Sequence, residues 1–348
     1  MKTSKSVALM ALGILWIAAS PGIHDACAQE TNKVGTAAAT FLRIPVGARA
    51  LSMGSSFVSM TDDPTGLFWN PAILPTMQSS AFVADHSDWL PGLTFDFAGI
   101  VLPLEGFGTV GFGATILRTD EMQVTTPAQQ MGTGETFSAS SLALGLTYSR
   151  SLTDRFSIGG TFRYIRETIY NCSASGFAFD VGTLYVTPFA GIRLGASISN
   201  FGSKLQMQGE DLNVRVDIAP DQEGNNQSVV GRIYTDAFDL PLIMRVGVSG
   251  EVFQTDEIRL TLSADGINPN DNAASVNVGG ELGLLTEAIR LRAGYRDLFL
   301  DKNEFGPTFG LSVNKLNVIG EVSITVDYGF QKFVHLGHSN RFSVTVHF

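Results

Sequence analysis

Charged residues stand at alternate positions inside segments of this 348-residue sequence that are otherwise apolar. In one such segment, Arg259 and Asp265 alternate with Ile258, Leu260 and Leu262. Because successive side chains of a β-strand point to opposite faces, the charges share one face and the apolar residues share the other. Opposite charges on neighbouring strands can pair across a sheet. The chemistry that this spacing predicts is ion pairing within a wall of strands, and not catalysis.

The charged positions continue along the chain and have mixed signs. The set that we expect on the inward face of a barrel consists of Arg163, Asp180, Arg193, Arg245, Arg259, Asp265, Glu281, Arg290, Arg292, Arg296, Glu321 and Asp327. Isolated charges in an interior are costly, so pairing or water is required. Two interpretations are open. The lumen is either solvated and paired within itself, as is general in such barrels, or its charges dock another segment of the chain.

Other spacings that resemble catalytic or metal motifs lack the required context. The string at 106–111, GFGTVG, matches a dinucleotide fingerprint, but a strand follows it where a helix is needed. His86, His335 and His338 have no carboxylate partner at metal-site spacing, and the polar run 265–272 lacks a glycine and a distant glutamate in the register of a calcium loop. We therefore expect no catalytic residue, no metal, no cofactor and no enzymatic activity.

The alternation predicts an all-β, transmembrane antiparallel β-barrel of about 14 strands. The segments are centred near residues 83, 98, 112, 144, 161, 181, 195, 245, 261, 279, 292, 311, 324 and 344. Short connections are expected to alternate with longer ones, including long loops through Asp88 and Asn171, and a tight turn is expected near Leu316. A secreted soluble β-protein would also alternate, but these strands lack the outward lysines and glutamates that protect soluble sheets. The chain ends on Phe348 after alternating apolar residues, which resembles the assembly signal of outer-membrane proteins.

The amino-terminal residues predict export. Lys2 and Lys5 precede an apolar run, and Ala26–Ala28 supplies small residues for cleavage, so residues 1–28 read as a signal peptide. The formal net charge of −10 excludes a nucleic-acid partner, because phosphates demand a basic surface. We expect three parts: the signal peptide at 1–28, a periplasmic or lumenal plug at 29–78, and a barrel at 79–348. The expected location is the outer membrane of a Gram-negative-type cell, in contact with its lipid.

The stretch Gly47–Leu74 is the one segment that does not read as strand. Ala50, Met53, Phe57 and Met60 recur at helical spacing. Two turns follow, each with a capping side chain ahead of a proline: Asp63–Pro64 and Asn70–Pro71. We expect this stretch to fold as a helical plug in the lumen, with Arg49, Asp62 and Asp63 as its charged contacts to the wall.

Three short motifs in and around this stretch resemble a known family. FLRIPVGARALSMG at 41–54, TDD at 61–63 and FWNPA at 68–72 are similar to the amino-terminal signature of the PorV/PorQ family, within the wider group of FadL-like outer-membrane barrels. The resemblance implies a hatch in the lumen around Asn70, Pro71 and Ala72. The expected plug or hatch residues are Arg49, Asp62, Asp63, Trp69, Asn70 and Pro71.

The resemblance implies two functions. PorV-like proteins assist type IX-like secretion or surface attachment of exported proteins, and their partners are secretion machinery and cargo. FadL-like proteins are channels for hydrophobic small molecules such as long-chain fatty acids. The sequence favours the first function, because the long loop from Phe201 to Asp239 is polar and acidic where capture of apolar ligands would want an apolar patch. A purely architectural role in the membrane is a third alternative.

Overall fold

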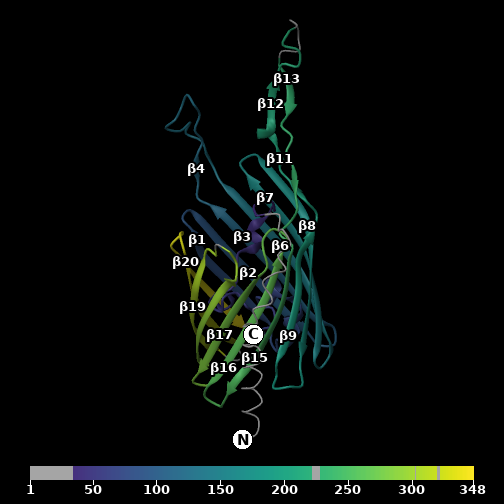
Figure 1. Cartoon of the computed structure of the whole chain (residues 1–348), viewed down its shortest axis with the longest axis vertical. Helices are drawn as coiled ribbons and strands as arrows, with labels where there is room; N and C mark the ends of the chain where they lie inside the picture. The colour runs from purple at the N-terminus through teal and green to yellow at the C-terminus, as the bar shows by residue number, and fades with distance from the viewer. Residues whose placement is uncertain (1–33, 222–227, 302, 320–321) are drawn as a thin grey trace. The chain divides into compact units, whose positions relative to one another are not determined.

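The computed structural model describes residues 34–221, 228–301, 303–319 and 322–348 (Figure 1). Val34–Phe348 forms one compact unit. The predicted signal peptide at 1–28 and the predicted inward charge Glu321 lie outside the described residues, so both stay predictions.

Fourteen strands of the described chain form a closed antiparallel barrel, as predicted, and β8 pairs with β9 to complete the circle. Every predicted strand centre falls inside one of them. The barrel strands are β1 (Ala81–Leu90), β2 (Leu93–Leu104), β3 (Gly108–Thr119), β6 (Ala139–Thr153), β7 (Phe156–Ile169), β8 (Cys172–Val186), β9 (Arg193–Gly202), β15 (Ile243–Gln254), β16 (Arg259–Pro269), β17 (Ser275–Leu284), β18 (Ile289–Leu298), β19 (Phe305–Ile319), β20 (Val322–Phe333) and β21 (His338–His347).

Short elements precede the barrel and decorate its loops. Before β1 come η1 (Thr40–Arg43), α2 (Ala48–Ser52), α3 (Gly66–Trp69) and η2 (Pro71–Thr76). The loop strands are β4 (Met122–Gln123), β5 (Thr136–Phe137), β10 (Leu205–Gln206), β11 (Gln208–Gly209), β12 (Asn213–Val216), β13 (Val229–Arg232) and β14 (Ala237–Phe238), with η3 (Glu210–Leu212) among them. In Figure 1, β12 and β13 extend well beyond the barrel strands.

The alternation of β16 divides its side chains as predicted. Thr261 and Asp265 are fully buried inside the barrel, whereas Leu262 is 46% exposed on the outer wall. An outer wall of apolar side chains suits contact with lipid. The inner wall departs from the prediction, because Phe95 and Ile165 are apolar and fully buried on the inward face. One side of the lumen is therefore apolar, and the alternation pattern did not indicate this.

The connections differ from prediction in three places. The links expected to be long at Asp88 and Asn171 are two-residue hairpins, since β1 ends at Leu90 before β2 begins at Leu93, and β7 and β8 are separated by residues 170–171. Positive φ angles at Gly92 (74°) and Tyr170 (49°) make these tight turns possible. Leu316, expected in a turn, lies inside β19. Long loops remain at 120–138 and 203–242, and we call the end of the barrel that carries them the loop end. The opposite end carries the short connections 105–107, 154–155 and 285–288, and we call it the turn end.

The predicted helix through Met60 is shorter than expected. It ends at Ser52, because Gly54 and Ser55 adopt positive φ angles of 62° and 63° that a helix does not accept. The apolar side chains at 50, 53, 57 and 60 are nevertheless all buried. The Asn70 cap is confirmed: its Oδ1 accepts a hydrogen bond from the Ala72 amide at 3.0 Å, with Pro71 as the first helical residue.

The segment 47–74, which we call the plug, lies in the lumen directly against the barrel wall. Main-chain or side-chain atoms of the plug approach the wall at inward-facing glycines, where an added Cβ would lie within 3.0 Å of a plug atom. These glycines are Gly159, Gly182, Gly195, Gly247, Gly279, Gly294 and Gly310. Because only glycine leaves room for such an approach, the wall and the plug fit each other over most of the circumference.

Candidate functional site: the plug and its ionic contacts

The carboxylate of Glu281 joins the plug to the wall, because it accepts hydrogen bonds from three guanidinium groups. Arg49 of α2 donates from Nε and Nη2 to Glu281 of β17, at 2.9 and 3.0 Å. Arg259 Nη2 and Arg292 Nε donate to the same carboxylate at 3.0 and 2.7 Å. Arg292 also donates to Asp327 at 2.6 Å. We call these five residues the Glu281 cluster; all of its members were predicted, and the sequence prediction of a charged docking surface fits this geometry.

The strand register brings the cluster together. Glu281 pairs directly with Arg292 across β17 and β18, and Arg259 of β16 stands opposite Gly283, which leaves space for a long side chain. Burial alone would lower the pKa of Arg49, but the charges of Glu281 and Asp63 more than reverse this and raise the pKa above its ordinary value. Arg49 therefore remains a cation inside the plug.

A second group of charges closes the lumen at the turn end. Glu287, in the connection after β17, accepts from Arg259 Nε at 2.6 Å and from Arg290 Nε at 2.8 Å. Partial burial raises its pKa, but the hydrogen bonds and charges of the two arginines prevail and hold the pKa of Glu287 below its ordinary value. Arg193 pairs with Glu251 at 2.9 Å. A cavity of about 260 Å³ opens between these groups and the underside of the plug.

The predicted roles of Asp62 and Asp63 need correction. Asp63 is buried, but it pairs with Arg49 of the plug at 3.1 Å and accepts from the Thr65 amide at 2.8 Å, so it holds the plug to itself and not to the wall. Asp62 is exposed, and its carboxylate makes no ion pair with any described residue. Its main-chain carbonyl accepts a long bond from Arg49 instead. The positive φ of Asp62, 55°, turns its side chain toward the turn-end cavity that it helps to line.

Hydrogen bonds to the plug main chain provide the other contacts. Asp265 Oδ2 accepts from the amides of Phe57 and Val58 at 2.6 and 2.9 Å. Asn70 Nδ2 donates to the carbonyls of Val58 and Thr183 at 2.7 and 3.1 Å, which joins the plug to β8. Trp69 is buried within the plug.

Trp69 and Pro71, the other two predicted plug residues, make different contacts. The Trp69 indole donates to the Val46 carbonyl at 2.9 Å, so it secures the chain that leads into the plug. Pro71 lies against Gly159 of β7. All six predicted plug residues thus belong to one segment, and four of them contact the wall: Arg49, Asn70, Pro71 and Trp69, whose ring lies 5.4 Å from the Arg245 guanidinium.

The sequence reading missed an ion pair at the start of the plug. Asp85 of β1 accepts from Arg341 at 2.8 Å, from Ser343 Oγ at 2.6 Å and from the Gly47 amide at 3.2 Å. Arg341 also donates to the carbonyl of Pro45. The signal was present, because the outward residues of β21 alternate and therefore place Arg341 and Ser343 on the inward face.

The remaining predicted charges are distributed around the lumen. Arg163 pairs with Asp180 of the adjacent strand, and Asp180 also accepts from the Asn200 amide at 2.6 Å. Arg296 pairs with its neighbour Asp297 at 3.1 Å, away from the Glu281 cluster. Arg245 makes no ion pair with any described residue. The arginine trio 290, 292 and 296 is therefore divided among four carboxylates: Glu287, Glu281, Asp327 and Asp297.

Phe348 lies at the turn end and is 50% exposed. Its amide donates to the carbonyl of Ser80 at 2.9 Å, which anchors the end of the chain beside the start of β1. Its role as an assembly signal stays a prediction.

Comparisons with known proteins give the fold and leave the family open. No protein-family model and no curated protein matches this sequence. Among solved structures, a FadL homologue from Pseudomonas aeruginosa matches with a TM-score of 0.53 at 12% identity, over 88% of this chain and 98% of that one. The toluene transporter TodX of Pseudomonas putida matches with a TM-score of 0.53 at 12% identity, over 87% and 97% of the two chains. The toluene transporter TbuX of Ralstonia pickettii matches with a TM-score of 0.51 at 12% identity, over 87% and 97%.

These likenesses are too distant in sequence to carry a function, and none of them supports the PorV/PorQ resemblance. They extend over almost the full length of each solved chain, so the likeness includes the whole barrel. The chain has the 14-stranded barrel fold of FadL-type outer-membrane channels.

Proposed function

We propose that this chain is an outer-membrane channel that passes hydrophobic small molecules, and that it is not an enzyme. The observation that carries the proposal is the full-length likeness to channels of this class, combined with an apolar lining at the loop end. The secretion role, which the acidic loop favoured in the sequence, becomes the second candidate.

Apolar side chains gather where a molecule from outside would first meet the lumen. Phe41 and Leu42 of η1 are buried there, in one apolar cluster with Phe95 of β2. Trp89 packs edge-on against Phe333, with ring centroids 5.3 Å apart. Burial of apolar surface is the main source of affinity for a hydrocarbon, so this lining suits an apolar ligand.

A cavity of about 280 Å³ lies beside this lining, at the short hairpin between β1 and β2. Trp89, Leu90, Pro91 and Leu93 form its apolar side, and its polar side consists of Asp88, Thr94, Asp120, His338 and Asn340. Its volume is close to the lower limit of about 300 Å³ for small-molecule sites. We assign this cavity as the site where the channel first binds its ligand. Because the plug fills the lumen, the plug must move before the ligand can pass through.

Uptake by cells tests the proposal. Replacing Leu93→Gln puts an amide into the apolar side of the cavity, and we expect the initial rate of uptake of radiolabelled toluene or oleate to fall about tenfold, the ratio that corresponds to 1.4 kcal/mol. The matched control is Phe107→Ser at the turn end, which should leave uptake unchanged. Equal uptake by the L93Q variant, the control and cells without the protein would refute a hydrophobic channel.

A second candidate function rests on the arm formed by residues 203–242. It contains the paired strands β12 and β13, with Val230 (67%) exposed in β13 and Ile218 (67%) and Tyr234 (80%) exposed in the chain next to these strands. A two-stranded ribbon that extends from the barrel offers unpaired strand edges to another chain. Acidic residues surround it: Glu210, Asp211, Asp217, Asp221, Asp236 and Asp239. These features suit contact with an exported protein or with secretion machinery.

Cross-linking distinguishes the second candidate from the first. With a photo-reactive group at Tyr234, we expect an exported protein to be captured in intact cells if the arm assists secretion or attachment. The same group at Phe107 of the turn end is the control. If no exported protein is captured from Tyr234 and export is normal without the chain, the secretion role fails, whatever the uptake assay gives.

A further inference from the structure

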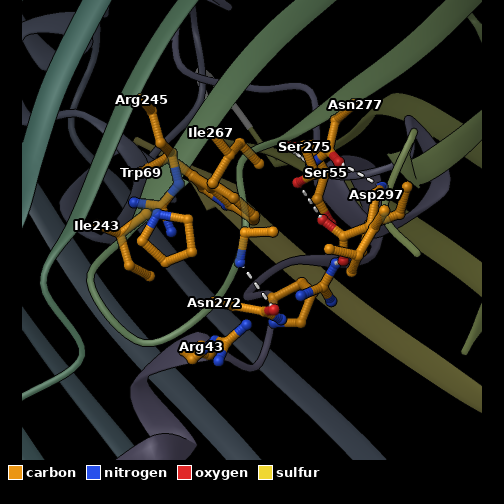
Figure 2. A pocket seen from close by; sticks show the side chains of 15 residues that line it. Arg43, Ser55, Trp69, Ile243, Arg245, Ile267, Asn272, Ser275, Asn277 and Asp297 are labelled. Carbon is orange, nitrogen blue, oxygen red and sulfur yellow. Dashed lines mark hydrogen bonds and ion pairs between the residues drawn. The ribbon is translucent and has the colours of Figure 1, made fainter. Parts of the chain in front are cut away.

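A small buried cavity between the plug and the loop-end half of the wall is lined by arginines. Its volume is about 30 Å³, and Arg43, Arg245 and Arg296 lie around it together with Trp69 and Ser55. In Figure 2, Arg245, Trp69 and Ile243 lie on one side of it, and Ser55, Ser275, Asn277 and Asp297 on the other.

Arg245 is the one lining arginine without an ion pair among the described residues, and the carboxylates whose charges act on it, Asp265 and Asp180, lie beyond ion-pair distance. Arg43 is paired with Asp271 at 3.0 Å and Arg296 with Asp297 at 3.1 Å. Arg245, only 5% exposed, has no carboxylate within 4.0 Å among the described residues. Its Nη1 donates to Ser199 Oγ at 3.2 Å, and its guanidinium lies 5.4 Å from the centre of the Trp69 ring. A hydroxyl and an aromatic face compensate a buried cation only in part.

Three buried donors at this cavity lack a partner among the described residues. They are Arg245 Nε, Arg296 Nη1 and Ser55 Oγ, which come from β15, β18 and the plug. All three residues line the same cavity. Buried polar groups are normally hydrogen-bonded, and a group left without a partner costs about 1–3 kcal/mol. Three such donors, one of them on a guanidinium without an ion pair, form a built site for an acceptor of negative charge.

We propose that this cavity binds a small monovalent anion, of the size of chloride or formate, between Arg245, Arg296 and Ser55. A single water needs about 10–15 Å³ of such space, so the cavity accepts a halide or an ion of a few atoms and excludes larger anions. The bound anion pairs with Arg245 and joins the plug to β15 and β18. The site is independent of the molecule that the channel passes.

Thermal unfolding of the purified, full-length protein tests the proposal. At constant ionic strength, replacing sodium gluconate by sodium chloride or sodium formate should raise the Tm in a saturable manner, because a ligand of the folded state alone stabilises it by mass action. The Arg245→Gln variant should lose this response. The control Arg118→Gln, an exposed arginine of the outer wall, should keep it.

Crystals grown in bromide give a second, direct measurement. Anomalous density at the cavity is expected for the wild-type protein and not for the R245Q variant. If the R245Q variant does not fold, Ser55→Ala removes one donor and should shift the chloride midpoint to higher concentration. A chloride response that is equal in the wild-type, R245Q and S55A proteins, or a wild-type protein with neither response nor bromide density, overturns the proposal. A response to formate alone keeps the site and excludes the halide.

Discussion

Replacing Glu281→Gln is expected to lower the free energy of unfolding by about 3–5 kcal/mol, the usual cost of removing one partner of a buried ion pair. The carboxylate is fully buried and accepts from Arg49, Arg259 and Arg292. A neutral amide does not offset the charge of three guanidinium groups. Its NH₂ group is a hydrogen-bond donor and would face another donor on one of them. Because Arg49 belongs to the plug, the same change should loosen the plug and raise ion conductance in planar bilayers.

Urea titration in detergent measures the first effect and single-channel recording the second. The matched control is Glu304→Gln, since Glu304 forms an exposed pair with His335 at 2.8 Å. Exposed pairs contribute about 0–1 kcal/mol, so this control should unfold like the wild-type protein and remain closed. If the E281Q variant were as stable as the E304Q variant, the Glu281 cluster could not be what fixes the plug.

The sequence predicted the barrel well because lipid imposes a simple rule on it. Outward side chains must be apolar, so the period of two is visible even where strands are short, and all fourteen strands are placed correctly. The inner wall obeys no such rule. Phe95 and Ile165 face inward in one apolar cluster with residues of η1 and the plug, and periodicity alone does not distinguish lipid from a packed interior.

The ionic contacts were predictable as a set and not as pairs. Alternation identified which charges face inward, but the partners depend on register and on the path of the plug. The stretch at 61–63 illustrates this: Asp63 turns back to Arg49, and Asp62 is exposed and makes no ion pair with any described residue. The pair Asp85–Arg341 joins the first and last strands, which become neighbours only when the barrel closes. No local pattern records that closure.

The alternation of apolar and charged residues does not indicate which glycines of the inner wall meet the plug. Replacing Gly294→Val is expected to displace the plug, because a Cβ there would meet the main chain of Met53 and Gly54. Overpacking in a filled core costs about 1–3 kcal/mol when side chains can shift. Here the added side chain meets the main chain of the plug, which cannot rotate away as a side chain can. The loss in the free energy of unfolding should therefore lie at or above the upper limit of that range.

The control for this change is Gly266→Val on β16, where the nearest atom to an added Cβ is 3.7 Å away. Both variants add the same side chain to a barrel strand, so a general loss of strand stability affects them alike. We expect the G294V variant alone to show raised ion conductance and increased protease cleavage between residues 47 and 74. A closed, protease-resistant G294V barrel would mean that the plug can move away from the wall without leaving the lumen. The close contacts between these glycines and the plug would then stabilise the fold without being what blocks the channel.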